Sequence, residues 1–244
     1  MTNIYNSNSF GDRSGSIESA KIIAPIITRM INPNSVVDLG CGTGEFLSIF
    51  RYKGINDILG IDGPWINKEK LMIPAKNFFT YDLNKKLRIN RRFDLAISLE
   101  VAEHIPKFKA EIFIDNLVAL SNVILFSAAI PYQGGLYHRN EQWPNYWAKI
   151  KKKKNYVPVD CIRMKIWNNK QVNYWYCQNT ILYVSKDYLN SNEIKFDNIL
   201  YQNDVPGLIH PELYLNRQSF VNYLMSRLPD KLRVKIIQMR KKIF

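Results

Sequence analysis

The chain has 244 residues, of which 46% are hydrophobic and 23% charged, enough for one sizeable core with a small appendage. No apolar run reaches the ~20 residues that a membrane span needs, and the polar first residues lack the apolar segment of a signal peptide. Cys41, Cys161 and Cys177 are widely separated, which argues against a disulfide scaffold and favours a cytoplasmic location.

The formal net charge of +13 has two interpretations. In the first, the charge indicates an anionic partner, such as a phosphorylated sugar, a nucleic acid or a membrane surface. In the second, it only reflects a lysine-rich composition. Much of the charge is local, in the run 151–154 and in the tail 228–244. The tail is suited to a peripheral membrane contact, a dimer arm or a nucleic-acid contact. The sequence leaves that choice and the oligomeric state open.

Predicted strands and helices alternate through the first half of the chain. After a loop or lid at 1–15, residues 16–30 have the apolar spacing of a helix. Strands are predicted at 35–39, 57–62, 78–83, 93–99 and 122–131, and helices at 45–52 and 107–121. This alternation is typical of an α/β, Rossmann-like, doubly wound parallel sheet.

The second half predicts an antiparallel edge to that sheet. A polar and aromatic loop at 132–147 precedes two strand-like runs, 156–167 and 172–185, with no crossover helix expected between them. We therefore expect one main domain at 16–187. Residues 188–244 are expected to form a linker and a basic helical extension.

The stretch "VVDLGCGTGEFL" places Gly40, Gly42 and Gly44 between a strand and a helix. Glycines there let a ligand approach the backbone, and a helix N-terminus attracts negative groups. Asp62 ends the next strand, where a carboxylate can accept both hydroxyls of a ribose. A nicotinamide or flavin site would require G-x-G-x-x-G, but position 45 is glutamate.

Four motifs in order resemble the class I S-adenosylmethionine (SAM)-dependent methyltransferases: "VVDLGCGTG", "GIDG", "YDL" and "FDLAISLEVAEHIP". The resemblance implies a seven-stranded fold with SAM as the cofactor. It implies that Asp38 and the glycines hold the methionine part, Asp62 the ribose, and Asp82 with Leu83 the adenine. The predicted cofactor contacts are Asp38, Gly40, Cys41, Gly42, Gly44, Asp62, Gly63, Asp82, Leu83 and Leu99.

The stretch "SLEVAEHIP" puts Glu100, Glu103 and His104 at the carboxyl end of the fourth strand. In a helical turn these side chains would share one face. His138 follows the fifth strand and is expected at the same edge. Carboxylates with imidazoles can bind a divalent cation, and the pattern resembles metal-dependent O-methyltransferases. That resemblance implies Mg²⁺ or Mn²⁺ bound by Glu100, Glu103, His104 and His138.

Two other interpretations of this stretch stay open. In the first, no metal binds, and His104 or His138 is a general base. In the second, the segment has a structural role at a helix start, because Glu103 and His104 precede Pro106. The catalytic candidates are His104, His138 and Glu100.

The loop "YQGGLYHRNEQWPNYW", with "GDRSGSIESAK", "VDCIRMKIWNN" and "WYCQNTILYV", resembles bacterial and viral methyltransferases encoded among glycan-building genes. This resemblance implies a sugar or glycan substrate. Aromatic faces with polar edges suit a pyranose ring, so the predicted substrate contacts are Tyr137, Arg139, Glu141 and Trp143. Trp147 fits equally well as packing of the next helix onto the sheet.

We therefore predict a SAM-dependent O-methyltransferase acting on a sugar hydroxyl in surface polysaccharide biosynthesis, of the O-antigen or capsule type. An RNA 2′-O-methyltransferase is an alternative, favoured by the E-x-x-E-H pattern and the charge. The lack of a recognisable RNA-binding module disfavours a nucleic-acid partner. A small-molecule O-methyltransferase and a non-catalytic SAM-binding scaffold are further alternatives. The sequence identifies neither the sugar, nor its hydroxyl, nor its carrier.

Overall fold

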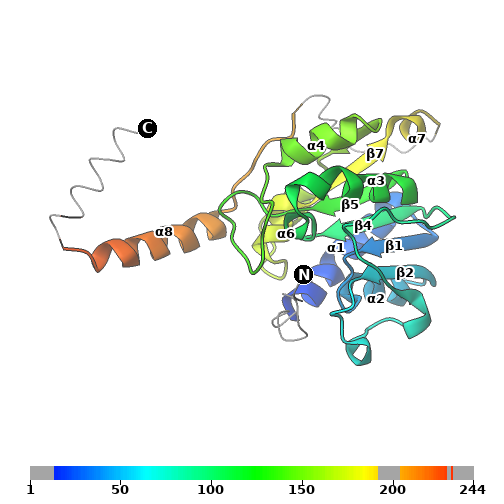
Figure 1. The fold of residues 1–244 in the computed structure, drawn as a ribbon, viewed down its shortest axis with the longest axis horizontal. Coiled ribbons are helices and arrows are strands. Elements are labelled where there is room, and N and C mark those ends of the chain that lie inside the picture. The colour runs from blue at the N-terminus through cyan, green and yellow to red at the C-terminus, as the bar shows by residue number, and fades with distance from the viewer. Residues whose placement is uncertain (1–13, 192–203, 230–231, 233–244) are drawn as a thin grey trace. The chain divides into compact units, whose positions relative to one another are not determined.

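The computed structural model describes residues 14–191, 204–229 and 232. The chain divides into two compact units, residues 1–208 and 209–244. The first unit holds one seven-stranded sheet with helices on both faces (Figure 1). In the second unit, helix α8 spans Pro211–Ser226. Within the described ranges, every helix is too short or too polar to cross a bilayer.

The sheet has the strand order β3-β2-β1-β4-β5-β7-β6. Its strands are β1 (Ser35–Leu39), β2 (Asp57–Asp62), β3 (Phe78–Thr80), β4 (Leu95–Leu99), β5 (Val123–Ser127), β6 (Tyr156–Val159) and β7 (Ile181–Ser185). The first five are parallel to one another, and β7 runs antiparallel to both β5 and β6. The predicted mostly parallel, doubly wound sheet with an antiparallel edge is confirmed. It brings the carboxyl ends of β1, β2, β4 and β5 to one edge.

Two layers of helices bury the two faces of the sheet. One face packs against α1 (Ser14–Ile31), α2 (Glu45–Tyr52), α5 (Arg163–Ile166) and α6 (Tyr174–Asn179). The other packs against α3 (Ala110–Leu120) and α4 (Pro144–Lys152). Neighbouring strand residues alternate between these cores, as Val36 and Val37 do, because strand side chains point to opposite faces. Burial on both faces explains the nearly continuous apolar strands.

Short elements complete the first unit. Among its described residues, four 3₁₀ helices lie in the connections: η1 (Lys68–Lys70), η2 (Ala75–Asn77), η3 (Ala102–His104) and η4 (Lys107–Lys109). Helix α7 (Lys186–Ser191) follows β7. Of these, η3 matters most for function, because it follows β4 directly and carries Glu103 and His104.

The predicted strands at 156–167 and 172–185 are too long. Only β6 and β7 are extended, and helices α5 and α6 lie between them. The helical turn of α6 directs Tyr176 edge-on against the ring of Phe46, at 5.6 Å between centroids, and buries Cys177 in the core. This packing overrides the strand preference of an aromatic-rich segment. The antiparallel pairing of β6 with β7 is confirmed.

The predicted domain ends can be compared with the structure only in part. Residues 1–13 of the predicted lid lie outside the described residues, whereas Ser14 and Gly15 begin α1. Three parts of the predicted extension also lie outside the described residues: 192–203, 230–231 and 233–244, which include most of the basic tail. Residues 204–208 group with the first unit, where Arg163 Nη1 donates a hydrogen bond to the Pro206 carbonyl oxygen at 3.0 Å.

Candidate functional site

The glycine loop between β1 and α2 passes through left-handed backbone conformations. The φ angle is 86° at Gly40 and 93° at Gly44, a region that residues with a Cβ rarely adopt. A Cβ on Gly40 would also lie 2.4 Å from Cγ2 of Val101. The loop therefore requires glycine, and it leads directly into the N-terminus of α2, a helix end that favours negative groups.

Asp62, at the carboxyl end of β2, closes the glycine loop. Its Oδ2 accepts a hydrogen bond from the Gly42 N–H at 2.7 Å, and its Oδ1 accepts one from the Gly63 N–H at 2.6 Å. A carboxylate oxygen can accept more than one hydrogen bond. The carboxylate is therefore held rigidly and can still accept ligand hydroxyls, as the ribose prediction requires.

Asp82 and Leu83 follow the end of β3 and lie beside β2. The Tyr81 N–H donates to the Asp62 carbonyl oxygen at 2.8 Å, which aligns this segment with the edge of the sheet. Leu83 is buried and Asp82 is half-buried. Asp82 Oδ1 accepts hydrogen bonds from the backbone and side chain of Asn84, at 3.0 and 2.9 Å. Both residues thus share the glycine loop's edge of the sheet.

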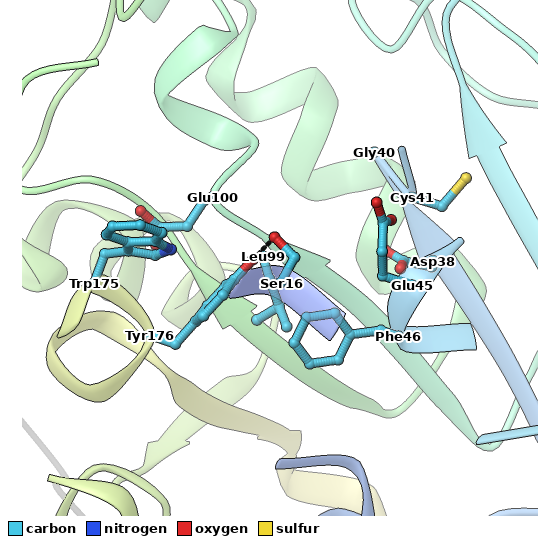
Figure 2. Close-up of a pocket in the computed structure, with 10 residues that line it drawn as sticks. All are labelled: Ser16, Asp38, Gly40, Cys41, Glu45, Phe46, Leu99, Glu100, Trp175 and Tyr176. Carbon is cyan, nitrogen blue, oxygen red and sulfur yellow. Dashed lines mark hydrogen bonds between the residues drawn. The ribbon is translucent and has the colours of Figure 1, made fainter. Parts of the chain in front are cut away.

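A cavity of about 210 Å³ opens at the ends of β1 and β4 (Figure 2). Five predicted residues line it: Asp38, Gly40, Cys41, Leu99 and Glu100. Five others were not predicted: Ser16, Glu45, Phe46, Trp175 and Tyr176. Ser16 Oγ lies 3.4 Å from Tyr176 Oη, so α1 and α6 meet at the cavity wall. A helical interpretation of "YWYCQN" would have been the signal for the α6 residues.

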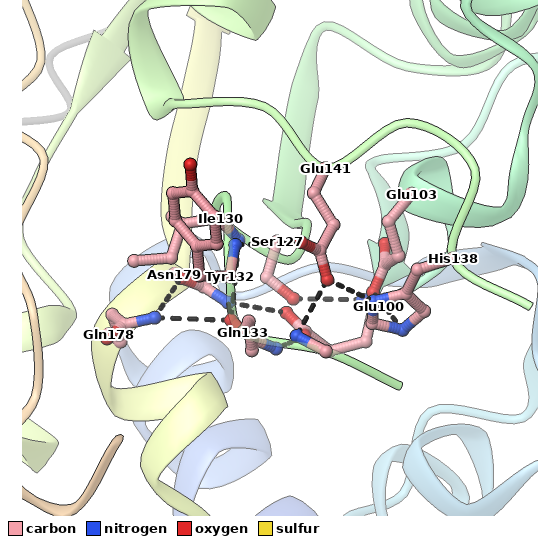
Figure 3. Close-up of polar contacts among 11 residues, drawn as sticks. Glu100, Glu103, Ser127, Ile130, Tyr132, Gln133, His138, Glu141, Gln178 and Asn179 are labelled. Atoms are coloured by element: carbon pink, nitrogen blue, oxygen red, sulfur yellow. Dashed lines mark hydrogen bonds and ion pairs between the residues drawn. The ribbon is translucent and has the colours of Figure 1, made fainter. Parts of the chain in front are cut away.

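Glu100 lines the cavity, and its carboxylate contacts a group of buried amides (Figure 3). Its φ angle of 55° is left-handed, which costs a non-glycine residue about 1–2 kcal/mol. Its N–H donates to Ser127 Oγ at 3.0 Å. Its Oε2 accepts from Gln133 Nε2 at 2.8 Å and its Oε1 from Asn179 Nδ2 at 3.1 Å. Burial raises the pKa of the Glu100 carboxyl, and these hydrogen bonds oppose the rise.

Glu103, His104 and His138 converge beside Glu100. One potential ligand atom from each of the three lies within 4.8 Å of the others. The rings of His104 and His138 are nearly perpendicular, with centroids 4.9 Å apart, and His138 Nε2 lies 3.9 Å from Glu103 Oε1. Burial raises the pKa of the Glu103 carboxyl well above its usual range, and the neighbouring Glu100 charge raises it further.

These three residues fit a divalent cation. The Glu103 side chain is fully buried, and neither of its carboxylate oxygens accepts a well-formed hydrogen bond from the described part of the chain. The backbone N–H groups of Glu103 and Ala129 lie near enough to oppose the rise of its pKa only in part. A buried carboxylate without donors is costly, and a cation would supply the partner. One carboxylate and two imidazoles suit borderline ions such as Mn²⁺, Fe²⁺ or Zn²⁺. Glu100, the fourth predicted ligand, lies outside this group.

Glu141 holds His138 in place. His138 Nδ1 lies 2.8 Å from Glu141 Oε1, an arrangement in which Nδ1 donates and Nε2 faces Glu103. The same carboxylate accepts hydrogen bonds from the N–H groups of Gly134 at 2.7 Å and Tyr132 at 2.8 Å. Carboxylates commonly orient metal-binding histidines in this way. Glu141, predicted as a substrate contact, is therefore engaged within its own loop.

A family model described as "Methyltransferase domain" matches residues 17–158, more than half of the chain. The chain belongs to this methyltransferase family. The family assignment supports SAM as the cofactor. A search of curated proteins found no match.

Two solved structures are similar to this methyltransferase in fold. The methyltransferase domain of bacterial CtHen1-C is 18% identical, with a TM-score of 0.54 over 70% of this chain and 99% of that one. Magnesium protoporphyrin IX methyltransferase (ChlM) from Synechocystis PCC 6803, solved with bound SAH, is also 18% identical. Its TM-score is 0.51, over 71% of this chain and 85% of that one. Both support the class I fold.

The other predicted substrate residues of the methyltransferase lie on the loop after β5. The Arg139 N–H donates to the Glu103 carbonyl oxygen at 2.8 Å, which fixes the loop to η3. Tyr137 and Trp143 are 40% and 43% exposed, so their rings remain partly accessible. Trp147 is buried against Phe126, in agreement with its interpretation as packing.

Proposed function

We propose that this methyltransferase transfers the methyl group of SAM to a sugar hydroxyl in surface-glycan biosynthesis, with a divalent cation bound by Glu103, His104 and His138. One observation carries the proposal. Glu100 lines the cofactor cavity, and η3 places Glu103 and His104 one helical turn further along the chain. The candidate metal group is therefore next to the cavity that would hold the methyl donor.

Different residues of the chain would bind the cofactor and the cation. The glycine loop and Asp62 would hold the cofactor. Glu103 keeps both carboxylate oxygens for the cation, and Glu141 keeps His138 turned toward Glu103. A cation bound there would lower the pKa of the acceptor hydroxyl and fix its approach to the methyl group.

Exposed aromatic side chains support a sugar as the acceptor. Tyr132, Tyr137 and Trp143 lie on the loop that is fixed to η3, and all three are exposed. Their rings are suited to the C–H face of a pyranose, while Arg139 on the same loop can bind a phosphate or an acidic sugar. The resemblance to glycan-associated methyltransferases points to the same class of substrate.

A second candidate is 2′-O-methylation of RNA. It is supported by the E-x-x-E-H pattern and by the net charge of +13. It predicts RNA binding that weakens steeply with salt, because each phosphate contact releases counterions.

Methyl transfer from tritium-labelled SAM tests the proposal. The acceptors are nucleotide sugars, a lipid-linked glycan, a surface polysaccharide and a short single-stranded RNA. We expect label in a sugar acceptor with adjacent hydroxyls, loss of labelling with EDTA, and recovery with Mn²⁺. Label in the RNA alone would favour the second candidate, and transfer that is insensitive to EDTA would exclude the metal.

The same assay should be carried out on one test variant and one control variant. Glu103→Gln removes one carboxylate charge from the cluster with little change in shape, and we expect it to lose transfer at least about 100-fold. Glu111→Gln removes a carboxylate that is 63% exposed on α3, where it pairs with Lys153. That variant should retain wild-type activity.

A further inference from the structure

We infer that Glu100 is not a metal ligand but the residue by which the cofactor cavity distinguishes SAM from its product, S-adenosylhomocysteine. This inference deepens the proposed function and rests on it, because it concerns the same cavity and the same cluster. The sequence pattern implied four metal ligands, Glu100, Glu103, His104 and His138, and the inference removes Glu100 from that set.

The amide groups around Glu100 are arranged to donate to it. Gln133 Oε1 accepts hydrogen bonds from Asn179 Nδ2 at 2.8 Å and from Gln178 Nε2 at 3.2 Å. Because these contacts occupy the oxygen of Gln133, its Nε2 group is the end that faces Glu100. Asn179 Oδ1 likewise accepts from Gln178 Nε2 at 3.0 Å, which turns Asn179 Nδ2 toward Glu100. The network therefore orients two N–H donors at one carboxylate.

These contacts would have to break for Glu100 to reach the metal cluster. Gln133, Gln178 and Asn179 are all buried. Moving the carboxylate of Glu100 would therefore leave buried donors with fewer partners, which is unfavourable. The Glu100 backbone is held as well, because its N–H donates to Ser127 Oγ and to the Ser127 carbonyl oxygen. The side chain is thus held against Gln133 and Asn179 at the wall of the cavity that Glu100 lines.

The cavity wall is acidic and aromatic. Asp38, Glu45 and Glu100 contribute carboxyl groups, and Phe46, Trp175 and Tyr176 contribute rings. The ten described lining residues include no lysine, arginine or histidine. Carboxylates and ring faces both attract a cation.

The charge of this wall should affect the binding of the two forms of the cofactor differently. SAM carries a positive sulfonium group, and S-adenosylhomocysteine has nearly the same shape without that charge. A negative charge at Glu100 therefore favours the substrate form and promotes release of the product.

Calorimetric titration of the full chain tests the inference with three ligands: SAM, S-adenosylhomocysteine and Mn²⁺. Glu100→Gln removes the charge and replaces one acceptor oxygen by an NH2 group that meets an amide donor. We expect it to weaken SAM binding about tenfold and to change S-adenosylhomocysteine binding less than about twofold. Mn²⁺ binding should remain within about twofold of wild type. Glu103→Gln is the matched variant, and it should lose Mn²⁺ binding while keeping the SAM preference.

A second variant probes the amide network. Gln133→Met keeps the length of the side chain and removes the donor to Glu100. It should lower the preference for SAM over S-adenosylhomocysteine about threefold. If Glu100→Gln fails to fold, this variant decides the question, and an unchanged preference overturns the inference.

The outcomes separate the inference from the proposed function. A Glu100→Gln protein that loses Mn²⁺ binding, or that keeps the wild-type preference for SAM, overturns the inference and leaves the methyltransferase proposal intact. A wild-type chain that binds neither SAM nor S-adenosylhomocysteine overturns the proposed function itself. If wild type binds both but no Mn²⁺, the metal proposal fails, and the SAM preference of Glu100→Gln still decides the role of Glu100.

Discussion

Among the buried charged side chains of the first unit, the Arg163–Asp160 pair and Glu103 differ in how well their hydrogen-bonding groups are satisfied. Arg163 and Asp160 are 0% and 3% exposed, and the guanidinium donates to both carboxylate oxygens and to the carbonyl oxygens of Gln178 and Pro206. Glu103 is equally buried, yet its carboxylate oxygens accept no well-formed hydrogen bond from the described residues.

The difference shows what each group is for. The Arg163–Asp160 pair joins α5, the end of α6 and residues 204–208 into one structure, so its charges serve the fold. The Glu103 group lies at the carboxyl edge of the sheet, next to the strained backbone of Glu100, and the Glu103 carboxylate lacks a well-formed hydrogen bond within the described residues. The buried pair has its hydrogen bonds within the fold, whereas the Glu103 carboxylate lacks them at the edge of the sheet where a ligand is expected.

The largest expected effect is on the satisfied pair. Arg163→Met leaves Asp160 buried without its partner and should lower the free energy of unfolding by about 3–5 kcal/mol. The double variant Arg163→Met/Asp160→Leu should recover most of that loss, since no charge remains unpaired. Urea unfolding with circular dichroism measures both. A loss below about 1 kcal/mol in the single variant would contradict the structural role of the pair.

The next largest expected effect is that of Mn²⁺ on the stability of the wild type and of Glu103→Gln. In EDTA, Glu103→Gln should not destabilise the protein, because it removes a buried charge that lacks donors. Mn²⁺ at about 100 times its dissociation constant should raise the stability of wild type by about 2.7 kcal/mol. The same Mn²⁺ should leave Glu103→Gln unchanged. Equal stabilisation of both proteins in urea unfolding would remove Glu103 from the cation site.

Lys151 offers a counterexample to this comparison, because it is buried without a hydrogen bond and yet is not among the candidate metal ligands. Its Nζ has no hydrogen-bond partner among the described residues. It lies over two aromatic rings, 3.2 Å from the centroid of Phe126 and 4.2 Å from that of Tyr183. Burial lowers the pKa of Lys151 well below its usual value. We interpret it as an amine enclosed by aromatic rings, not as a second site.

The pH dependence of stability tests that interpretation. The unfolded chain holds a proton on Lys151 that the folded chain lacks, so this residue makes stability rise with pH, from its folded pKa up to about 10.4. Lys151→Met should abolish that part of the rise and stabilise the protein by about 1–3 kcal/mol at pH 7. The difference between the two urea midpoints, followed from pH 7 to 10, isolates the effect. A variant that is less stable at pH 7 would show that the amine has a favourable role.

The parts of the fold that were predictable from sequence are those set by local patterns. The strands at 35–39 and 57–62 match β1 and β2 residue for residue, because short β-branched runs are bounded there by glycine, asparagine and proline. The meeting of Glu103, His104 and His138 also followed from chain order, since carboxyl ends of parallel strands share one edge. The remaining features depend on distant contacts.

Long-range contacts determine two features that the sequence pattern did not predict, the orientation of Glu100 and the helix that contains Tyr176. Glu100 turns to Gln133 and Asn179, which lie 33 and 79 residues away in the chain. The strand-like segment with Tyr176 is helical because it packs against α1, where Ser16 lies 160 residues away. Local propensity carries no information about either contact.

The most direct test of the account is the effect of bound Mn²⁺ on SAM that carries ¹³C in its methyl group. The central claim is that the cation held by Glu103, His104 and His138 lies beside the reacting methyl. In wild-type protein saturated with both ligands, we expect the methyl resonance to broaden strongly. The broadening should vanish with EDTA and in Glu103→Gln. A sharp methyl resonance, with both ligands shown to be bound, would contradict the claim.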